Sequence, residues 1–258
     1  MRRPATAPLA RSEIYGDDGP DLDDPAELFH EASKLRPALA RRQAAGIVRL
    51  EGNEALGAAA ARAVRRNPER RTLPLPAPRR PPCTLWTAID RRRSRRSFRG
   101  AIDDGALATL LDAAYGLREP GRRTVPSGGA LYPLELYVAL RGRGVYRYDP
   151  ELHLLEEHEV EDPWPAVTRA SPLPSLVDDA AAAVLVLAVF GRTRFKYGLR
   201  GYRFALLEAG HVVQNLALAA AALDVVALPF GGYYDGCVDE LAGADGVDES
   251  VVYAVVLG

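Results

Sequence analysis

Lys196 and Tyr197 form the adjacent pair whose residue types best suit proton transfer in this chain. Of the 33 Lys and Arg residues only two are Lys, so Arg supplies the generic positive charge throughout the sequence. A desolvated Lys can lose its proton near neutral pH and act as a base, whereas Arg stays protonated. Gly198 and Gly201 follow the pair and are expected to loosen the backbone. The residues alone leave two interpretations open: an acid–base pair, or a Lys that survives by chance on a solvated loop.

A second candidate site is the Arg-rich run of residues 62–99, which carries thirteen Arg and two acidic residues. Several guanidinium groups around a hydroxyl suit one phosphate, because Arg offers paired donors and Ser a further hydrogen bond. A solvated basic face is an alternative, and nucleic-acid contact is another. Nucleic-acid binding is favoured by interleaved aromatic residues, and only Phe98 is present in the densest part. A phosphate-bearing small ligand is therefore slightly favoured at the densest part of the run, residues 92–98, which we call the Arg-Ser cluster.

The third candidate is the Ser-Gly-Gly loop, which we define as residues 126–133 (Pro-Ser-Gly-Gly-Ala-Leu-Tyr-Pro). Two successive glycines permit positive φ and close approach of the backbone to a flat ligand, and the flanking prolines restrain the loop. The spacing matches neither the dinucleotide-binding fingerprint nor the P-loop. An ordinary Gly-rich connection into the next strand is the open alternative.

The composition is that of a soluble globular protein. The 258 residues are 48% apolar and 26% charged, with a net charge of −1, which argues against a surface wholly devoted to nucleic acid or membrane. Cys83 and Cys237 form no CxxC motif and suit a reducing cytosol. No secretory signal or clustered metal-ligand set is present, and the longest apolar run, residues 204–223, is interrupted by polar residues. We therefore expect a cytoplasmic protein without a membrane span or a metal site.

The chain is predicted to divide at about residue 80. Residues 1–80 should form an N-terminal extension, and residues 81–258 a compact unit of helices and strands. Within the extension, residues 1–23 are expected to be a loose arm, and the Pro-rich run 72–82 must be extended, as a linker or a strap over a surface.

Two helices are predicted in the extension. Asp24-Pro25-Ala26-Glu27 combines a capping Asp, a Pro at the first helical position and a Glu that completes a capping box, so a helix should run to about Leu35. Residues 38–67 could hold another.

In residues 81–258, Thr84 should cap a short helix, and Asp103 a clearer one that stops at Gly116. A helix of about twenty residues should follow the Lys-Tyr pair, with a Gly-rich turn between the last two strands. The predicted strands are residues 134–140, 145–148, one near Leu154, 182–190 (buried and central), 225–230 and 250–257.

A polar stripe of Glu208, His211 and Asn215 lies on the otherwise apolar long helix. A satisfied buried network at a dimer interface is favoured over a catalytic role for His211.

Taken together, these segments resemble the nitroreductase superfamily, and within it the SagB-type dehydrogenases, which are FMN-dependent azoline oxidases. The Arg-Ser cluster resembles the family's flavin-phosphate motif, and the Ser-Gly-Gly loop is closer still to the SagB-type loop. The further matching segments, in the family's order, are residues 29–35, 145–150, 196–198, 208–216 and 231–235.

The resemblance implies an α+β fold with a central mixed or antiparallel sheet sandwiched by helices, and FMN held between the subunits of a homodimer. The implied FMN-binding residues are Arg92, Arg93, Ser94 and Arg96 at the phosphate and ribityl end, and Pro126, Ser127, Gly128, Gly129, Leu131, Gln214, Gly231 and Gly232 around the ring. The implied catalytic acid–base pair is Lys196 and Tyr197.

The implied reaction is oxidation of a thiazoline or oxazoline to an azole in peptide natural-product biosynthesis. A Lys with a lowered pKa can take a carbon-bound proton, a Tyr can share or orient it, and a hydride goes to flavin N5. Oxygen would re-oxidise the flavin. The substrate would be a heterocycle-bearing peptide or a smaller amino-acid-derived molecule, presented by a cyclodehydratase or a carrier partner.

The sequence departs from the family pattern at two places, and two further hypotheses about its function stay open. Ordinary nitroreductases carry an Asn and a Gln where this loop has Ala130 and Tyr132, which makes an NAD(P)H-dependent nitro- or flavin-reductase the second hypothesis. Many members also continue past the position of Gly258 to another basic residue near the phosphate. A third hypothesis is a non-enzymatic protein whose Arg-rich run binds a leader peptide or nucleic acid.

Overall fold

The computed structural model describes residues 24–39, 45–53, 65–98, 101–159 and 161–258. Within these ranges the core is a seven-stranded sheet in the order β1-β6-β5-β4-β7-β9-β8. Every neighbouring pair in it is antiparallel. Its strands are β1 (Thr72–Pro74), β4 (Leu134–Leu140), β5 (Gly144–Asp149), β6 (Leu154–Glu159), β7 (Ala182–Val189), β8 (Ala227–Phe230) and β9 (Glu249–Leu257). A separate two-stranded ribbon is formed by β2 (Leu117–Glu119) and β3 (Arg122–Arg123).

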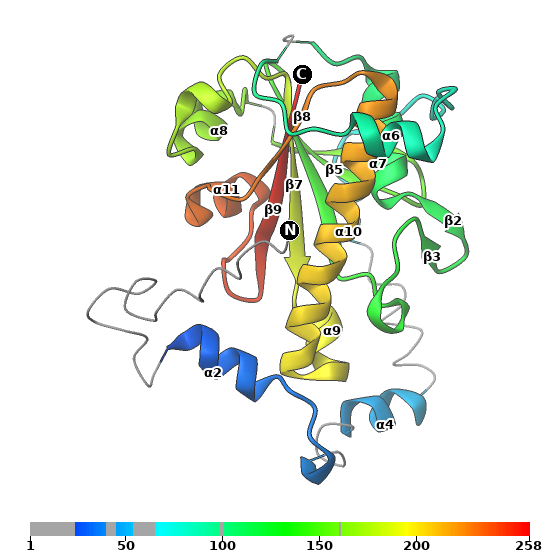
Figure 1. Cartoon of the computed structure of the whole chain (residues 1–258), viewed down its shortest axis with the longest axis vertical. Coiled ribbons are helices and arrows are strands. Elements are labelled where there is room, and N and C mark those ends of the chain that lie inside the picture. The colour runs from blue at the N-terminus through cyan, green and yellow to red at the C-terminus, as the bar shows by residue number, and fades with distance from the viewer. Residues whose placement is uncertain (1–23, 40–44, 54–64, 99–100, 160) are drawn as a thin grey trace, which may run out of the picture.

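Helices cover both faces of the sheet (Figure 1). One face packs against α7 and α10, and the other against α8 and α11. The α-helices are α2 (Pro25–Ala32), α4 (Ala45–Glu51), α6 (Leu85–Arg91), α7 (Asp104–Tyr115), α8 (Trp164–Ala170), α9 (Gly191–Tyr197), α10 (Leu199–Leu223) and α11 (Asp235–Ala242). The 3-10 turns are η1 (Pro37–Leu39), η2 (Gly128–Ala130) and η3 (Pro174–Leu176). The expected α+β sandwich with an antiparallel sheet is thereby confirmed.

The predicted helix starts are confirmed because their caps form. Asp24 accepts a hydrogen bond from Ala26 N at 2.8 Å. Thr84 and Asp103 cap α6 and α7 in the same way, and Gly116 ends α7. Helix α2 ends at Ala32, three residues earlier than predicted. In the 38–67 stretch the structure describes α4, and the predicted arm of residues 1–23 lies outside the described residues.

Several local features of the structure differ from the expectations or were not predicted. The Lys-Tyr pair lies in the last turn of α9 rather than on a loop, and Gly201 does not loosen the chain but is buried inside α10. The Pro-rich run is extended at Thr72–Pro74, as predicted, but there it forms an edge strand paired with β6 rather than a linker or strap, at an edge position that tolerates Pro74. Helices α8 and α11 were not predicted, and α11 lies where only a Gly-rich turn was expected.

Helix α10 is the element that links the parts of the candidate site. Among the described residues it is long and apolar enough to cross a membrane by length and composition. One face of it, including Ala205, Val212 and Leu216, is buried in the core, as in the central helix of a globular domain. Cys83 and Cys237 are free thiols.

Candidate active site

Lys196 and Tyr197 both direct their functional atoms at the Ser-Gly-Gly loop. A methyl group added to the Cα of Gly129 would lie 2.5 Å from Tyr197 Oη and 3.0 Å from Lys196 Nζ. The Lys196 Nζ lies 5.2 Å from the centroid of the Tyr197 ring. Two segments predicted separately from the sequence therefore meet at one point, and this point can support proton transfer.

The junction of α9 and α10 holds the pair in place. Gly198 has φ +55° and ψ −136°, a conformation that glycine adopts readily, and it turns the chain directly from one helix into the next. Gly201 lets the helices touch, since a Cβ there would lie 2.6 Å from the backbone carbon of Thr193. The Thr193 hydroxyl also donates to the Gly201 carbonyl at 3.0 Å.

The ring of Tyr197 is fixed from the side of α10. It packs edge-on against Phe204, with 5.0 Å between ring centroids. The same Phe204 ring would lie 2.9 Å from a Cβ on Gly128. Both glycines of the loop are therefore required by close packing, and the loop is more than an ordinary connection into β4.

The Ser-Gly-Gly loop is tightly constrained. Gly129 has φ +67°, and the non-glycine residues Ala130 and Tyr132 have φ +53° and +43°. Left-handed backbone at such residues is strained, and strain of this kind concentrates at functional sites. The Ser127 hydroxyl accepts from Tyr132 N at 2.9 Å, and the Tyr132 hydroxyl accepts from Arg123 N at 3.0 Å.

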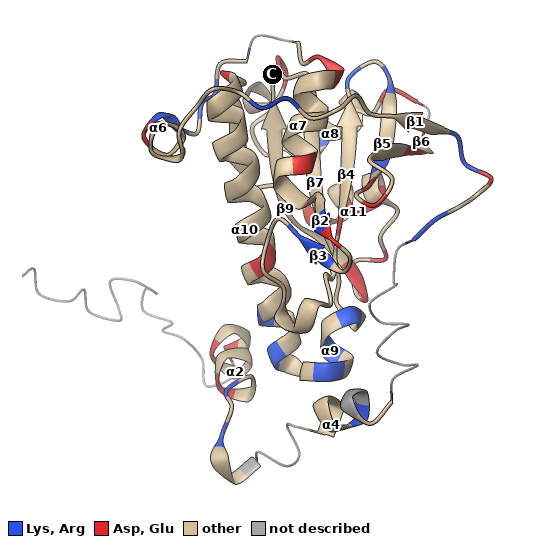
Figure 2. Ribbon diagram, turned by 90° about the vertical axis from the view of Figure 1, so that its right-hand side faces the viewer, with Lys and Arg blue, Asp and Glu red and all other residues tan. Residues whose placement is uncertain are grey.

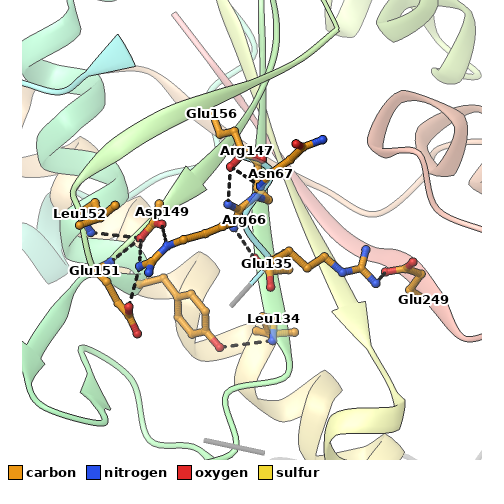
Figure 3. A network of polar contacts seen from close by, with 12 residues as sticks. Arg66, Asn67, Leu134, Glu135, Arg147, Asp149, Glu151, Leu152, Glu156 and Glu249 are labelled. Atoms are coloured by element: carbon orange, nitrogen blue, oxygen red, sulfur yellow. Dashed lines mark hydrogen bonds and ion pairs between the residues drawn. The ribbon is translucent and has the colours of Figure 1, made fainter. Parts of the chain in front are cut away.

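Helix α9 is also anchored at its first turn by a buried ion network. Arg192 Nη2 lies 2.5 Å from Glu135 Oε1 on β4. Glu135 pairs in turn with Arg147, which pairs with Glu156 at 3.1 Å. Figure 3 shows the part of this chain formed by Glu135, Arg147 and Glu156, with Arg66 reaching Asp149 beside it. The sequence carried no signal for this network, because it joins residues far apart along the chain.

Glu208 lies beneath the Ser-Gly-Gly loop. The Tyr115 hydroxyl donates to Glu208 Oε1 at 2.6 Å and accepts from Leu134 N at 3.3 Å. Burial raises the pKa of Glu208 to about 7, although hydrogen bonds from Ser127 and Tyr115 oppose the shift. Of the polar stripe, Glu208 is buried and Asn215 donates to the Thr124 carbonyl at 3.3 Å. His211 is exposed, and its place at a dimer interface stays a prediction.

Glu208→Gln is expected to flatten the pH dependence of stability in the flavin-free protein. A carboxyl whose pKa rises from 4.5 to about 7 on folding holds its proton more tightly in the native state. The free energy of unfolding should therefore fall as pH rises from 4.5 through about 7, and then level off, by about 3 kcal/mol in total. Urea unfolding of both proteins at about pH 5 and pH 8 measures this. An equal pH dependence in the two proteins would contradict the assignment.

The Arg-Ser cluster lies at the far end of α10. A cleft of about 360 Å³ is lined there by Arg91, Arg93 and Arg95, together with Ala217 and Ala221 of α10 among others. Of the predicted phosphate ligands Arg93 lines this cleft, whereas Arg92, Ser94 and Arg96 do not. Arg91 is the last residue of helix α6, and the residues that follow it, through Phe98, lie in no helix or strand. The signal that could have indicated Arg91 and Arg95 is their place in the same dense run of Arg residues.

The remaining predicted FMN residues are scattered around the molecule. Gly231 and Gly232 follow β8 and are exposed, with open space where a Cβ would stand. Gln214 is exposed on α10, and Pro126 is exposed at the start of its loop. The Leu131 side chain is buried, which leaves its backbone as the part that a ligand could meet. Their roles stay predictions. No cluster of three or more His, Cys, Asp and Glu residues suited to a metal occurs in the described chain.

The two halves of the predicted FMN site are far apart within one chain. The Ser-Gly-Gly loop meets α10 at Phe204, and the Arg-lined cleft meets it from Ala217 onward. At 1.5 Å of rise per residue this separation is roughly 20 Å.

Known proteins resemble this chain in sequence and in fold. The model of the nitroreductase family matches residues 89–258. A Methanocaldococcus jannaschii protein that carries the name nitroreductase MJ1384 is 35% identical over 159 residues, covering 59% of this chain and 80% of that protein. The microcin B17-processing protein McbC of Escherichia coli is 32% identical over 154 residues, covering 53% of this chain and 54% of McbC.

One solved structure covers nearly the whole chain. It is the E. coli microcin synthetase McbBCD complex with truncated pro-MccB17 bound, with a TM-score of 0.58, 23% identity and coverage of 97% of both chains. This match supports the fold.

Proposed function

The chain belongs to the nitroreductase family and is an oxidoreductase; on this premise we propose that it is a SagB-type, FMN-dependent dehydrogenase that oxidises an azoline to an azole. The observation that carries the proposal is the convergence of Lys196 Nζ and Tyr197 Oη on Gly129. The similarity to McbC, which is named for processing microcin B17, supports a peptide substrate.

The residues present fit FMN. The cleft lined by Arg91, Arg93 and Arg95 offers several guanidinium groups to a phosphate. The Ser-Gly-Gly loop and the open Gly231-Gly232 backbone can meet a flat ring closely. When bound, FMN supplies a hydride acceptor that dioxygen can re-oxidise, so that no nicotinamide is required.

A second copy of the chain would complete the cofactor site. The loop and the Arg-lined cleft lie roughly 20 Å apart along α10, farther than a ribityl phosphate reaches. The side of α10 between them carries Leu206 and Leu207, which are 41% and 62% exposed. Exposed apolar residues of this kind are typical of a subunit interface. We therefore propose a homodimer in which the two chains share each FMN.

In the proposed reaction Lys196 acts as the base. Its amine would take the carbon-bound proton of the azoline, while a hydride leaves the ring for the oxidised cofactor. Tyr197 would orient or share that proton, because its hydroxyl meets the same point as the Lys196 amine. The ring thereby loses one proton and one hydride, which together amount to two protons and two electrons, and becomes an aromatic azole. A cyclodehydratase partner that makes azolines is the class of enzyme that would supply the substrate.

The proposal predicts a yellow purified protein that removes two hydrogen atoms from an azoline peptide. An absorbance spectrum detects the flavin, and mass spectrometry after aerobic incubation detects the mass loss. A colourless protein that binds RNA with steep salt dependence would instead support the basic-segment hypothesis.

A nitro- or flavin-reductase is the second candidate, supported by the 35% identity to the protein named nitroreductase MJ1384. Rapid bleaching of the flavin by NADPH, with no loss of mass from azoline peptides, would favour it. Slow bleaching together with azoline oxidation would exclude it as the main activity.

A further inference from the structure

The N-terminal extension docks directly on the backbone of the Lys-Tyr pair. A Cβ on Gly46 of α4 would lie 2.4 Å from the Lys196 carbonyl oxygen. The backbones of α4 and α9 therefore pack directly against each other, without a side chain between them at this point. Helix α2 packs on the first turns of α10, where Phe29 meets Tyr202 edge-on at 5.3 Å. Arg203 Nη2 also donates to the His30 carbonyl at 2.7 Å.

A cleft of about 480 Å³ lies where α2, α4 and α9 meet. Its lining includes four cationic residues, and none of the described residues that line it is acidic. Figure 2 shows Lys and Arg residues concentrated on α9 and present on α4 at this end of the molecule. The four cationic residues are Arg49, Arg194, Lys196 and Arg200.

The same cleft has an apolar component. Leu35, Phe195 and Leu199 line it and are 64%, 39% and 41% exposed. A volume of this size accommodates a few residues of an extended peptide. Apolar side chains next to guanidinium groups suit a peptide that carries both apolar and acidic residues.

Lys196 belongs both to this cleft and to the site proposed for proton transfer. Lys196 lines the cleft, and its amine also reaches to within 3.0 Å of a Cβ position on Gly129. A chain segment held in the cleft therefore lies next to the proposed base.

We propose that this cleft binds an acidic segment of the peptide substrate, with its carboxylates paired to Arg49 and Arg194. The proposal rests on the peptide dehydrogenase function proposed above and names the chemistry by which the substrate is held. The extension thereby contributes one wall of the substrate site, and the acidic segment places the neighbouring azoline at Lys196.

Fluorescence anisotropy of the full-length holoprotein tests this without turnover. The probes are a labelled eight-residue peptide with three Glu and two Leu, and the same peptide with Gln in place of each Glu. The Glu peptide should bind about tenfold more tightly than the Gln peptide, and the difference should shrink at high salt. Equal binding of the two peptides by the wild-type protein would overturn the proposal, whatever any variant does.

Substitutions of the cleft arginines test whether the Glu peptide binds in this cleft. The double variant Arg49→Gln, Arg194→Gln should lose the preference for the Glu peptide, whereas Arg122→Gln should keep it, because Arg122 is exposed on β3, outside the cleft. Circular dichroism and flavin absorbance establish that each variant is folded. A preference that survives in the double variant would place the binding elsewhere. Tighter binding of a labelled eight-nucleotide DNA, also lost in the double variant, would assign the cleft to nucleic acid instead.

The peptide-binding experiment can fail or succeed independently of the test for azoline oxidation. Azoline oxidation without a preference for the Glu peptide would leave the dehydrogenase standing and remove this inference. A Glu preference without azoline oxidation would leave an acidic-peptide site on a protein of another activity.

Discussion

Lys196→Ala should lower the turnover of an azoline substrate by roughly 10²–10⁴-fold while the flavin content of the protein stays unchanged. The variant removes the amine proposed to take the proton and touches none of the arginines of the Arg-lined cleft. Its backbone position in α9 is compatible with Ala, which favours helix. Single-turnover bleaching of the flavin by substrate, measured without oxygen, reports the proton and hydride steps directly.

Two further substitutions sharpen this test. Lys196→Arg keeps the positive charge but cannot give up its proton, so it should be nearly as slow as Lys196→Ala. Lys34→Ala changes the only other Lys, which is exposed and ion-paired with Glu31, and should leave turnover unchanged. Tyr197→Phe should also be slow. Full activity in Lys196→Ala would remove Lys196 from the mechanism.

Gly129→Ala should reduce turnover by about 10²-fold with only a small loss of stability. The new methyl group would stand 2.5 Å from Tyr197 Oη and 3.0 Å from Lys196 Nζ, so both side chains must move away from the loop. Displacing a catalytic group by about 1 Å costs rates of this order. The clashing atoms are the ends of flexible side chains, so the fold can adjust. The free energy of unfolding should fall by about 1–2 kcal/mol, mainly from the positive φ.

Gly121→Ala is the matched control for this variant. Gly121 has φ +74°, close to the +67° of Gly129, and a Cβ there meets nothing within 4 Å. Both variants should lose similar stability in urea unfolding, and only Gly129→Ala should lose turnover. If Gly121→Ala slows the enzyme equally, backbone strain rather than contact with the Lys-Tyr pair explains the effect.

Much of the fold could be predicted because it rests on local interactions. The caps at Asp24, Thr84 and Asp103 start helices through hydrogen bonds within a few residues. The residues of β7 form a continuous apolar run because side chains on both faces of this strand lie in the core, and such a run predicts a buried strand. The missed helix α11 begins at Asp235, separated by two residues from Gly231-Gly232, where the two glycines favoured the prediction of a turn.

The candidate site also combines features that the sequence predicts with features that only the tertiary structure shows. The order of its motifs, the scarcity of Lys and the Gly-Gly pair are properties of the sequence, and they were enough to indicate the family and the acid–base pair. Only the tertiary structure decided that Lys196 and Tyr197 end a helix, and that both meet Gly129. It also decided that Arg91 and Arg95 line the cleft beside Arg93, and that Gly46 brings the extension onto Lys196. These contacts join residues far apart along the chain, where no local hydrogen bond or periodicity reports them, so packing alone determines them.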